Sequence, residues 1–487
     1  MRWQPWLTYV LSGLLLRCIV GLGPHSGMGR PPMFGDFEAQ RHWLEITVNL
    51  PVSRWYVHGP DNDLQYWGLD YPPATALHSL ALGLVARQVH PAMVELNASR
   101  GSETEGTKTW MRFFALVSDA LTYIPAVCLF FHTSPSLALL ALATPAFVVI
   151  DHGHFQFNCV YHGLVVLALY VLRRADHVRV RDALVAAVLF SLAINFKIMA
   201  LYFAPAFFFY LLAWCRERAF VLRFCLLGLT VVATFALVWA PFFATGTALN
   251  VLQRIFPYER GLFEDKVANF WCTLNLVVKI RMVLTKPALG ALSFALTWLS
   301  VLPACVRVYS KPSPVHFLWA LFTSSLGVFL FAFQVHEKTI MLPLVPMTLL
   351  AETVPGPATW FAVLCMYSMS PLLLRDGIGV ASMCMTGVYL ILAAHVFGIS
   401  TLRLLPTPNG AARDVSVALC LICVISAGLL GLLALAPPPP PRLPDLWVVL
   451  VNTWSFVLLS GFFAWGTWMQ WPQRRTDDDD TVKSKTD

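Results

Sequence analysis

Charged residues are scarce in this sequence, and apolar residues are abundant. Asp, Glu, Lys and Arg make up 13% of the 487 residues, whereas hydrophobic residues make up 57%. Because soluble domains carry roughly 25% charged residues, this composition argues against a soluble protein. The apolar runs recur from Trp6 to Trp471. We therefore expect an all-α polytopic membrane protein, with nearly the whole chain in the membrane region.

Cysteine is missing from the longest polar segment. All eleven cysteines lie in or beside apolar runs, from Cys18 to Cys423, and residues 23–109 contain none. No disulfide can therefore brace that segment. Cys420 and Cys423 have the spacing of a redox pair, but they stand in an apolar run without a polar partner, where packing is the commoner role.

Motifs of soluble enzymes are missing as well. The chain has no glycine-rich phosphate cradle, no Ser-His-Asp order and no Gly-x-Ser-x-Gly. A transferase built on this chain would have to take its donor from the membrane. The formal net charge of +7 comes from basic residues scattered between apolar segments, which argues against a nucleic-acid partner.

The apolar runs themselves predict about fourteen transmembrane helices, because a span needs about 20 apolar residues and tolerates roughly 17–25. The shorter apolar segment 270–280 is interpreted as an interfacial or re-entrant piece, since counting it as a span would export a basic loop. The predicted spans are 6–22, 111–131, 134–151, 159–173, 183–195, 198–214, 221–243, 287–306, 315–334, 339–352, 357–374, 378–397, 414–436 and 445–468.

Lys and Arg in the short connections predict the orientation. With a cytosolic N-terminus, the basic connections 173–182, 216–223, 307–311 and 398–413 become cytosolic, and the polar clusters become lumenal. The expected parts are a first transmembrane helix at 1–22, a polar lumenal loop at 23–109, a transmembrane core at 111–352, C-terminal helices at 357–471 and a cytosolic tail at 472–487.

Two short signals agree with this orientation. Asn97-Ala98-Ser99 is an N-glycosylation acceptor in the loop assigned to the lumen. Lys483 and Lys485 form a dilysine pattern at the C-terminus, which retrieves membrane proteins to the endoplasmic reticulum from the cytosolic side. The less favoured alternative is an ordinary soluble tail.

The stretch "FGDFEAQRHW" places four ionisable groups close together in the polar loop. Residues 36–50 predict a short amphipathic helix on the membrane surface, where Asp36, Arg41 and their neighbours would stay hydrated. Asp36 follows Gly35 and stands where an N-cap residue belongs, so one interpretation is that it only caps this helix.

Two further clusters carry polar side chains suited to a sugar or phosphate. Asp70 and Tyr71 belong to "LQYWGLDYPP", whose aromatic residues suit sugar stacking or an interfacial belt. "DHGHFQFN" (151–158) is a weak metal motif, because no matching His or carboxylate stands at helical spacing. Its polar side chains are predicted either to line a substrate site or to cap helices. They are Asp151, His152, His154, Gln156 and Asn158.

Basic residues gather in two later segments. Residues 254–271 mix three basic with three acidic side chains, and "QVHEK" (334–338) places His336 and Lys338 at a span end. Cations at the membrane surface suit a lipid phosphate. The second His of a zinc-helix motif is missing after His336.

Five of these motifs together resemble one family. "PPMFGDFEAQRHWLEIT", "LQYWGLDYPP", "DHGHFQFN", "RGLFEDKVANFWC" and "FQVHEKTI" occur in the order seen in the dolichyl-phosphate-glucose-dependent α-1,3-glucosyltransferases of the endoplasmic reticulum. Within that family, the first motif is more similar to the enzyme that adds the first glucose than to the sibling that adds the second.

The resemblance implies a GT-C glycosyltransferase fold and a lumenal active site in the endoplasmic reticulum membrane. It implies inverting transfer of glucose from dolichyl phosphate glucose to a terminal mannose of the dolichyl-diphosphate-linked nine-mannose oligosaccharide, without a metal. Asp36 would be the general base, and the leaving phosphate would need positive neighbours. The candidates for that are His336, Lys338 and Arg41, while Asp70, Tyr71, Asp151, His152, His154 and Gln156 would line the acceptor or donor site.

The sequence leaves a rival from another class, a transporter or flippase of lipid-linked sugars. Transporters commonly show repeat symmetry and charged residues near the membrane midplane. Here no internal repeat is evident, and the polar groups gather at one predicted face. The enzyme interpretation is therefore preferred.

Overall fold

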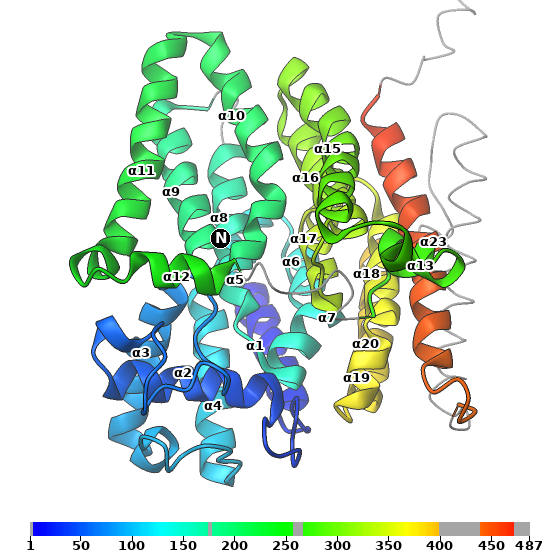
Figure 1. Cartoon of the computed structure of the whole chain (residues 1–487). Coiled ribbons are helices and arrows are strands. Elements are labelled where there is room, and N and C mark those ends of the chain that lie inside the picture. The colour runs from blue at the N-terminus through cyan, green and yellow to red at the C-terminus, as the bar shows by residue number, and fades with distance from the viewer. Residues whose placement is uncertain (1–2, 174–177, 257–265, 399–438, 472–487) are drawn as a thin grey trace, which may run out of the picture.

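The computed structural model describes residues 3–173, 178–256, 266–398 and 439–471, and these form helices and loops without any β-strand (Figure 1). The expected all-α architecture is confirmed. Up to residue 173 the elements are α1 (Trp3–Gly21), α2 (Gly35–Asn49), η1 (Val52–Arg54), α3 (Pro73–Val89), η2 (Pro91–Val94), α4 (Glu105–Leu121), α5 (Tyr123–Phe130), α6 (Pro135–Leu142), α7 (Pro145–Val148), η3 (Val149–Phe155) and α8 (Asn158–Arg173).

The remaining described elements are also helical. They are α9 (Val180–Phe196), η4 (Ile198–Phe203), α10 (Ala204–Glu217), α11 (Phe220–Ala244), α12 (Ala248–Ile255), α13 (Phe270–Val277), α14 (Ile280–Val283), α15 (Lys286–Ser310), α16 (Pro314–Phe331), η5 (Glu337–Ile340), α17 (Met341–Leu349), α18 (Pro355–Ser368), α19 (Ser370–Arg375), α20 (Gly379–Phe397) and α23 (Leu446–Met469).

Seven helices of the described residues are long and apolar enough to cross a membrane, or eight if the bent pair at 135–155 counts as one span. The expected fourteen spans are therefore not confirmed. Several predicted spans form helices that are shorter, such as α17 with nine residues. The segment 270–280 contains the eight-residue α13, too short to span. The predicted span 414–436 and Lys483 and Lys485 lie outside the described residues.

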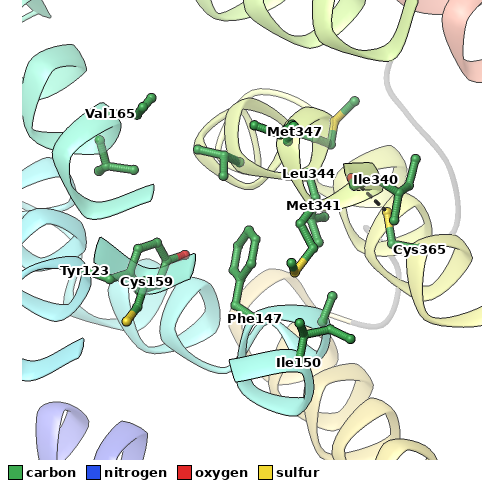
Figure 2. Close-up of a cluster of buried hydrophobic side chains, with 14 of the residues drawn as sticks. Tyr123, Phe147, Ile150, Cys159, Val165, Ile340, Met341, Leu344, Met347 and Cys365 are labelled. Carbon is green, nitrogen blue, oxygen red and sulfur yellow. Dashed lines mark hydrogen bonds between the residues drawn. The ribbon is translucent and has the colours of Figure 1, made fainter. Parts of the chain in front are cut away.

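One large apolar core joins the two halves of the chain. Phe147 and Ile150 of the bent segment face Met341 of α17 in Figure 2, and all three side chains are at most 5% exposed. Apolar side chains that interlock between helices stabilise the bundle by close packing. The core therefore fixes η3 relative to η5 and α17, which matters for the site below.

The polar segment 151–155 has an unusual backbone. α6 and the segment Pro145–Phe155 meet at an angle of 51°, and residues Val149–Phe155 form a π-helix. Phe155 ends it with a φ of +88°, in the left-handed region. Single π-helical turns occur frequently at functional sites, because they re-aim side chains that an α-helix would turn away.

The loop before α2 sets where that helix begins. Gly27 and Gly35 both have positive φ, and a Cβ on Gly27 would lie 2.1 Å from the carbonyl carbon of Phe34. Only glycine tolerates this combination of conformation and close approach. In Figure 1, α2 and α3 lie below α9 and α11, with α12 running crosswise between them. The two glycines thus allow the tight loop that places the start of α2 below the helix bundle.

Candidate active site

Three donors converge on one oxygen of Asp36, near the start of α2. The Gln156 amide donates to Oδ2 at 2.5 Å, and Nε2 of His154 lies 3.0 Å from the same oxygen. The Lys338 ammonium forms an ion pair with Oδ2 as well. Within the described part of the chain, no donor reaches Oδ1. The two carboxylate oxygens therefore have different tasks: one is anchored and the other can receive a ligand.

The structure does not support a helix cap as the task of Asp36. Phe34 occupies the N-cap position in a left-handed conformation and makes no side-chain cap. The amide N–H of Phe37 donates instead to Oγ of Ser26 at 3.1 Å. The interpretation of Asp36 as a capping residue is wrong, because the helix starts one residue earlier and Ser26 supplies the acceptor.

The surroundings keep Asp36 ionised. Burial alone would raise the pKa of this carboxyl, but the charges of Lys338 and His154 outweigh burial and hold the pKa well below its ordinary value. The side chain is still 27% exposed. A carboxylate that is both charged and accessible can accept a proton or a hydrogen bond from a ligand.

A buried chain of polar groups extends from Asp36 into the protein. Oε1 of Gln156 accepts from the Lys197 ammonium at 2.9 Å, and Lys197 also donates to Oδ1 of Asn158 at 2.6 Å. The Asn158 amide donates to Oδ1 of Asp151 at 2.7 Å. The same amide donates to Oε1 of Gln156 at 3.0 Å, so Asp151 is two hydrogen bonds removed from Gln156 and supports it from the protein interior.

A cavity of about 230 Å³ opens beside Asp36. It brings together segments that the sequence places far apart, including the predicted Asp70, Tyr71 and His336. Aromatic rings form part of the wall, and Nε1 of Trp43 donates to the carbonyl of Trp67 at 2.8 Å. The polar and aromatic residues that line the cavity are Asp36, Gln40, Trp43, Trp67, Asp70, Tyr71, Gln156, Asn158, Tyr161, Lys197, Arg254, His336 and Lys338.

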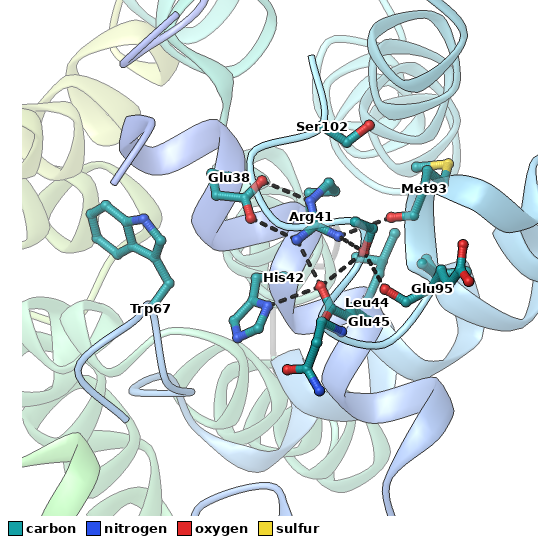
Figure 3. A network of polar contacts seen from close by, with 12 residues as sticks. Glu38, Arg41, His42, Leu44, Glu45, Trp67, Met93, Glu95 and Ser102 are labelled. Carbon is teal, nitrogen blue, oxygen red and sulfur yellow. Dashed lines mark hydrogen bonds and ion pairs between the residues drawn. The ribbon is translucent and has the colours of Figure 1, made fainter. Parts of the chain in front are cut away.

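Arg41 does not belong to this cavity. Its side chain is fully buried, and its guanidinium donates to both oxygens of Glu38, to Glu45 and to Oγ of Ser99 at 2.6–2.7 Å (Figure 3). A further donation reaches the carbonyl of Met93 at 2.9 Å. The prediction that Arg41 binds phosphate is therefore disfavoured, because its donors are already used inside the protein.

The same network shows that α2 is not a hydrated surface helix. Residues 37–48 are all buried, including Glu38, His42 and Glu45 at no more than 1% exposure. Burial by itself would raise the pKa of Glu45, but hydrogen bonds and charges from His42 and Arg41 lower it to about 2. The four ionisable groups of "FGDFEAQRHW" thus divide into one cavity residue and three network residues.

Two other predicted residues lie away from Asp36. His152 pairs with another carboxylate: its Nε2 lies 2.9 Å from Asp119, the partner of Arg17. The structure does not bring His152 into the cavity. Asn97 is exposed, with a φ of +62°, and its backbone N–H donates to Glu45 at 2.8 Å. A glycan on Asn97 would point to solvent.

Several residues of the site were not singled out as site residues from the sequence, and three of them are charged. Lys197 and Arg254 line the cavity. Arg254 donates to the carbonyls of Leu69 and Gly68 at 3.0 Å and so connects α12 to the loop that carries Asp70. The third is Asp376, whose Oδ2 lies 2.5 Å from Nδ1 of His154. Within the described residues, no three His, Cys, Asp or Glu side chains are arranged to hold a metal ion.

Comparisons with known proteins match this chain over nearly its whole length. The model of the ALG6, ALG8 glycosyltransferase family matches residues 13–465. The "Dolichyl pyrophosphate Man9GlcNAc2 alpha-1,3-glucosyltransferase" of Pongo abelii is 42% identical, over 92% of this chain and 93% of its own. The protein of that name from Rattus norvegicus is 41% identical, over 94% and 96% respectively. Among solved structures, apo ArnT from Cupriavidus metallidurans has a TM-score of 0.45 and 13% identity, over 96% of this chain and 78% of its own.

Proposed function

The chain belongs to the ALG6, ALG8 glycosyltransferase family, and from this premise we propose that it transfers glucose from dolichyl phosphate glucose to a terminal mannose of dolichyl-diphosphate-linked Man9GlcNAc2. The new bond would be an α-1,3 link. The single observation that carries this proposal is the carboxylate of Asp36, which is anchored through Oδ2 and lines the cavity.

Asp36 would act as the general base. A β-linked glucosyl phosphate that yields an α-linked product requires a single inverting displacement at the anomeric carbon. The attacking mannose hydroxyl must then lose its proton, and general-base help contributes roughly 10²–10⁴-fold. Oδ1 of Asp36 would take that proton, while the three donors on Oδ2 hold the carboxylate in position.

Cations on the same cavity would receive the phosphate. Lys338, His336 and Arg254 line it, and dolichyl phosphate leaves already ionised, so it needs positive partners and no strong acid. Lys338 is in contact with Asp36 before the donor arrives. Sharing its charge with the phosphate would weaken its hold on the carboxylate, so that Asp36 becomes a better base when the donor is bound.

The aromatic wall would bind the sugars. Trp43, Trp67 and Tyr71 line the cavity together with the carboxylate of Asp70. Aromatic faces stack on the apolar faces of sugar rings, and carboxylates accept hydrogen bonds from sugar hydroxyls. This combination supports a carbohydrate ligand beside Asp36.

The test is glucosyl transfer by purified Asp36→Asn protein, with dolichyl phosphate glucose as donor and Man9GlcNAc2 lipid as acceptor. We expect at least a 10²-fold loss of turnover, because the amide cannot take a proton. Asp63→Asn is a matched control, since that carboxylate is 45% exposed and lies outside the cavity lining. Near-normal transfer by folded Asp36→Asn protein would exclude Asp36 as the base.

Acceptor choice separates this function from its alternatives. We expect transfer to the Man9GlcNAc2 lipid and none to the same lipid carrying one glucose; the reverse result would identify the sibling enzyme that adds the second glucose. Translocation of lipid-linked sugar across proteoliposomes without any transfer would identify the transporter instead.

We further propose that the enzyme resides in the endoplasmic reticulum membrane, with the site in the lumen and both termini in the cytosol. The segments that meet at the cavity are those that the distribution of Lys and Arg assigns to the lumen. Glycosylation of the exposed Asn97 would test this orientation directly, because N-glycans are added in the lumen. Endoglycosidase should increase the gel mobility of the cellular protein, and Asn97→Gln should abolish that change. Cleavage of 23–109 by protease added outside sealed microsomes would contradict the orientation.

A further inference from the structure

We propose that Asp376 is a positioning residue for the transfer reaction, acting on Asp36 through His154. The inference rests on the proposed role of Asp36 as base and deepens it. It assigns a task to the C-terminal helices, since Asp376 lies in the connection between α19 and α20.

His154 lies between two carboxylates. Nδ1 is 2.5 Å from Oδ2 of Asp376, and Nε2 is 3.0 Å from Oδ2 of Asp36. The side chains of His154 and Asp376 are only 3% and 4% exposed, so this arrangement is largely closed to solvent. Nε2 also lies 3.1 Å from the Lys338 ammonium.

The pairing with Asp376 restricts the chemistry of the imidazole. An ionised carboxylate only accepts hydrogen bonds, so Nδ1 must carry a hydrogen. Nε2 is then either a lone pair that accepts from Lys338 or an N–H that donates to Asp36. Only the second form holds the anchored oxygen, because a lone pair on Nε2 would face Oδ2 of Asp36 without donating to it, and this form requires a hydrogen on both ring nitrogens. A tautomer with hydrogen on Nε2 alone would leave Nδ1 facing Asp376 without a proton. Asp376 therefore fixes the ring so that the doubly protonated form of His154 donates to both carboxylates.

The backbone around Asp376 keeps it in register with the π-helix. The N–H of Ser26 donates to the carbonyl of His154 at 3.0 Å, and Arg30 donates to the carbonyl of Arg375 at 2.7 Å. The loop before α2 is thus tied to both sides of the His154–Asp376 pair. A displacement of the C-terminal helices would therefore shift the position of Asp36 through these contacts.

Two arginines also lie near the His154–Asp376 pair. Arg112 of α4 donates to the carbonyls of His152 and Gly153 at 2.5 and 3.0 Å. Arg375 is 60% exposed and lies 3.9 Å from Oδ1 of Asp376. The charged and titratable groups that surround His154 from the packed elements are Asp36, Lys338, Asp376, Arg375, Arg112 and His25.

The experiment compares full-length Asp376→Asn, His154→Gln and the double variant, purified in lipid nanodiscs, with Asp63→Asn as control. We expect Asp376→Asn to lower kcat by about 10–100-fold, the range found when carboxylate partners of metal-binding histidines are removed. KM for both substrates should stay within about threefold, because Asp376 does not line the cavity. In the His154→Gln background, Asp376→Asn should cause no further loss, since its effect passes through His154.

Two results would overturn the inference. One is wild-type turnover of folded Asp376→Asn protein while Asp36→Asn is inactive; the other is a double variant whose losses multiply. If Asp36→Asn itself remains active, the proposed base fails instead, so the two failures are distinct. Should Asp376→Asn not fold, Asp376→Ser, which leaves room for a water at the same place, is judged by the same criteria.

Discussion

Lys197 helps to determine which way the Gln156 amide faces, together with the Asn158 amide, which donates to the same Oε1 at 3.0 Å. The Lys197 ammonium donates to Oε1 of Gln156 at 2.9 Å, and an ammonium can only donate, so the amide oxygen must point to it. The NH₂ group is thereby directed to Asp36, where it donates to Oδ2 at 2.5 Å. A buried cation thus orients a neutral side chain that in turn holds the proposed base.

We expect Lys197→Met to lower turnover by about tenfold, roughly the 1.4 kcal/mol of one charge-assisted hydrogen bond. Methionine keeps the length and apolar stem of lysine but removes one of the two donors, Lys197 and Asn158, that fix the Gln156 amide. Steady-state transfer by the purified variant measures the effect, and exposed Lys279→Met is the control. Unchanged turnover would mean that the amide keeps its orientation without Lys197.

Lys338→Gln should move the acid limb of the pH–rate profile to higher pH. Burial raises the pKa of Asp36 and Lys338 contributes to lowering it, so removal of this charge allows that pKa to rise. The deprotonated base is lost as pH falls through its pKa, and activity therefore declines at a higher pH in the variant. The measurement is kcat/KM against pH, with Lys279→Gln alongside. An unshifted acid limb would show that Lys338 does not control Asp36.

Local sequence patterns predicted Lys338, His336 and Gln156 as site residues because each stands in a motif at a span end, whereas Asp36 as the base was implied by the family resemblance. These patterns could not predict whether Arg41 would be exposed or buried, since the burial of a charged segment depends on which other segments pack against it. Here Glu38 and Glu45 on the same helix and Ser99 from a later loop satisfy Arg41 inside the protein. Asp376 carries no local signal, because its partner His154 is distant in sequence and only the packed core brings them together.

Arg41→Met should destabilise the fold without changing donor binding. Its loss would leave the carboxylates of Glu38 and Glu45 buried without their cation, and breaking such a buried pair costs about 3–5 kcal/mol. Thermal unfolding of the purified protein should therefore occur at a clearly lower temperature than in Arg54→Met, whose side chain is exposed. A raised donor KM at normal stability would instead restore Arg41 as a phosphate ligand.

Buried His25 should make the fold sensitive to mild acid. Burial lowers the pKa of His25 from 6.5 to about 4, so the unfolded chain binds a proton that the folded protein excludes. The resulting stability is present above pH 6.5 and is lost as pH falls towards 4. His25→Gln should reduce the slope of unfolding free energy against pH by about one proton in that window. Some slope will remain, because burial also lowers the pKa of His78 to about 4.

The control for this titration is His58→Gln, since His58 is 70% exposed. Chemical unfolding followed by tryptophan fluorescence between pH 4 and 7 gives the slopes. His25 stacks on Phe37 with ring centroids 3.9 Å apart, so the loss of stability should begin at the start of α2. Transfer activity should therefore decline with unfolding below pH 6.5 in the parent protein, and the decline should be shallower in His25→Gln. Equal slopes in all three proteins would exclude His25 as the acid-sensitive group.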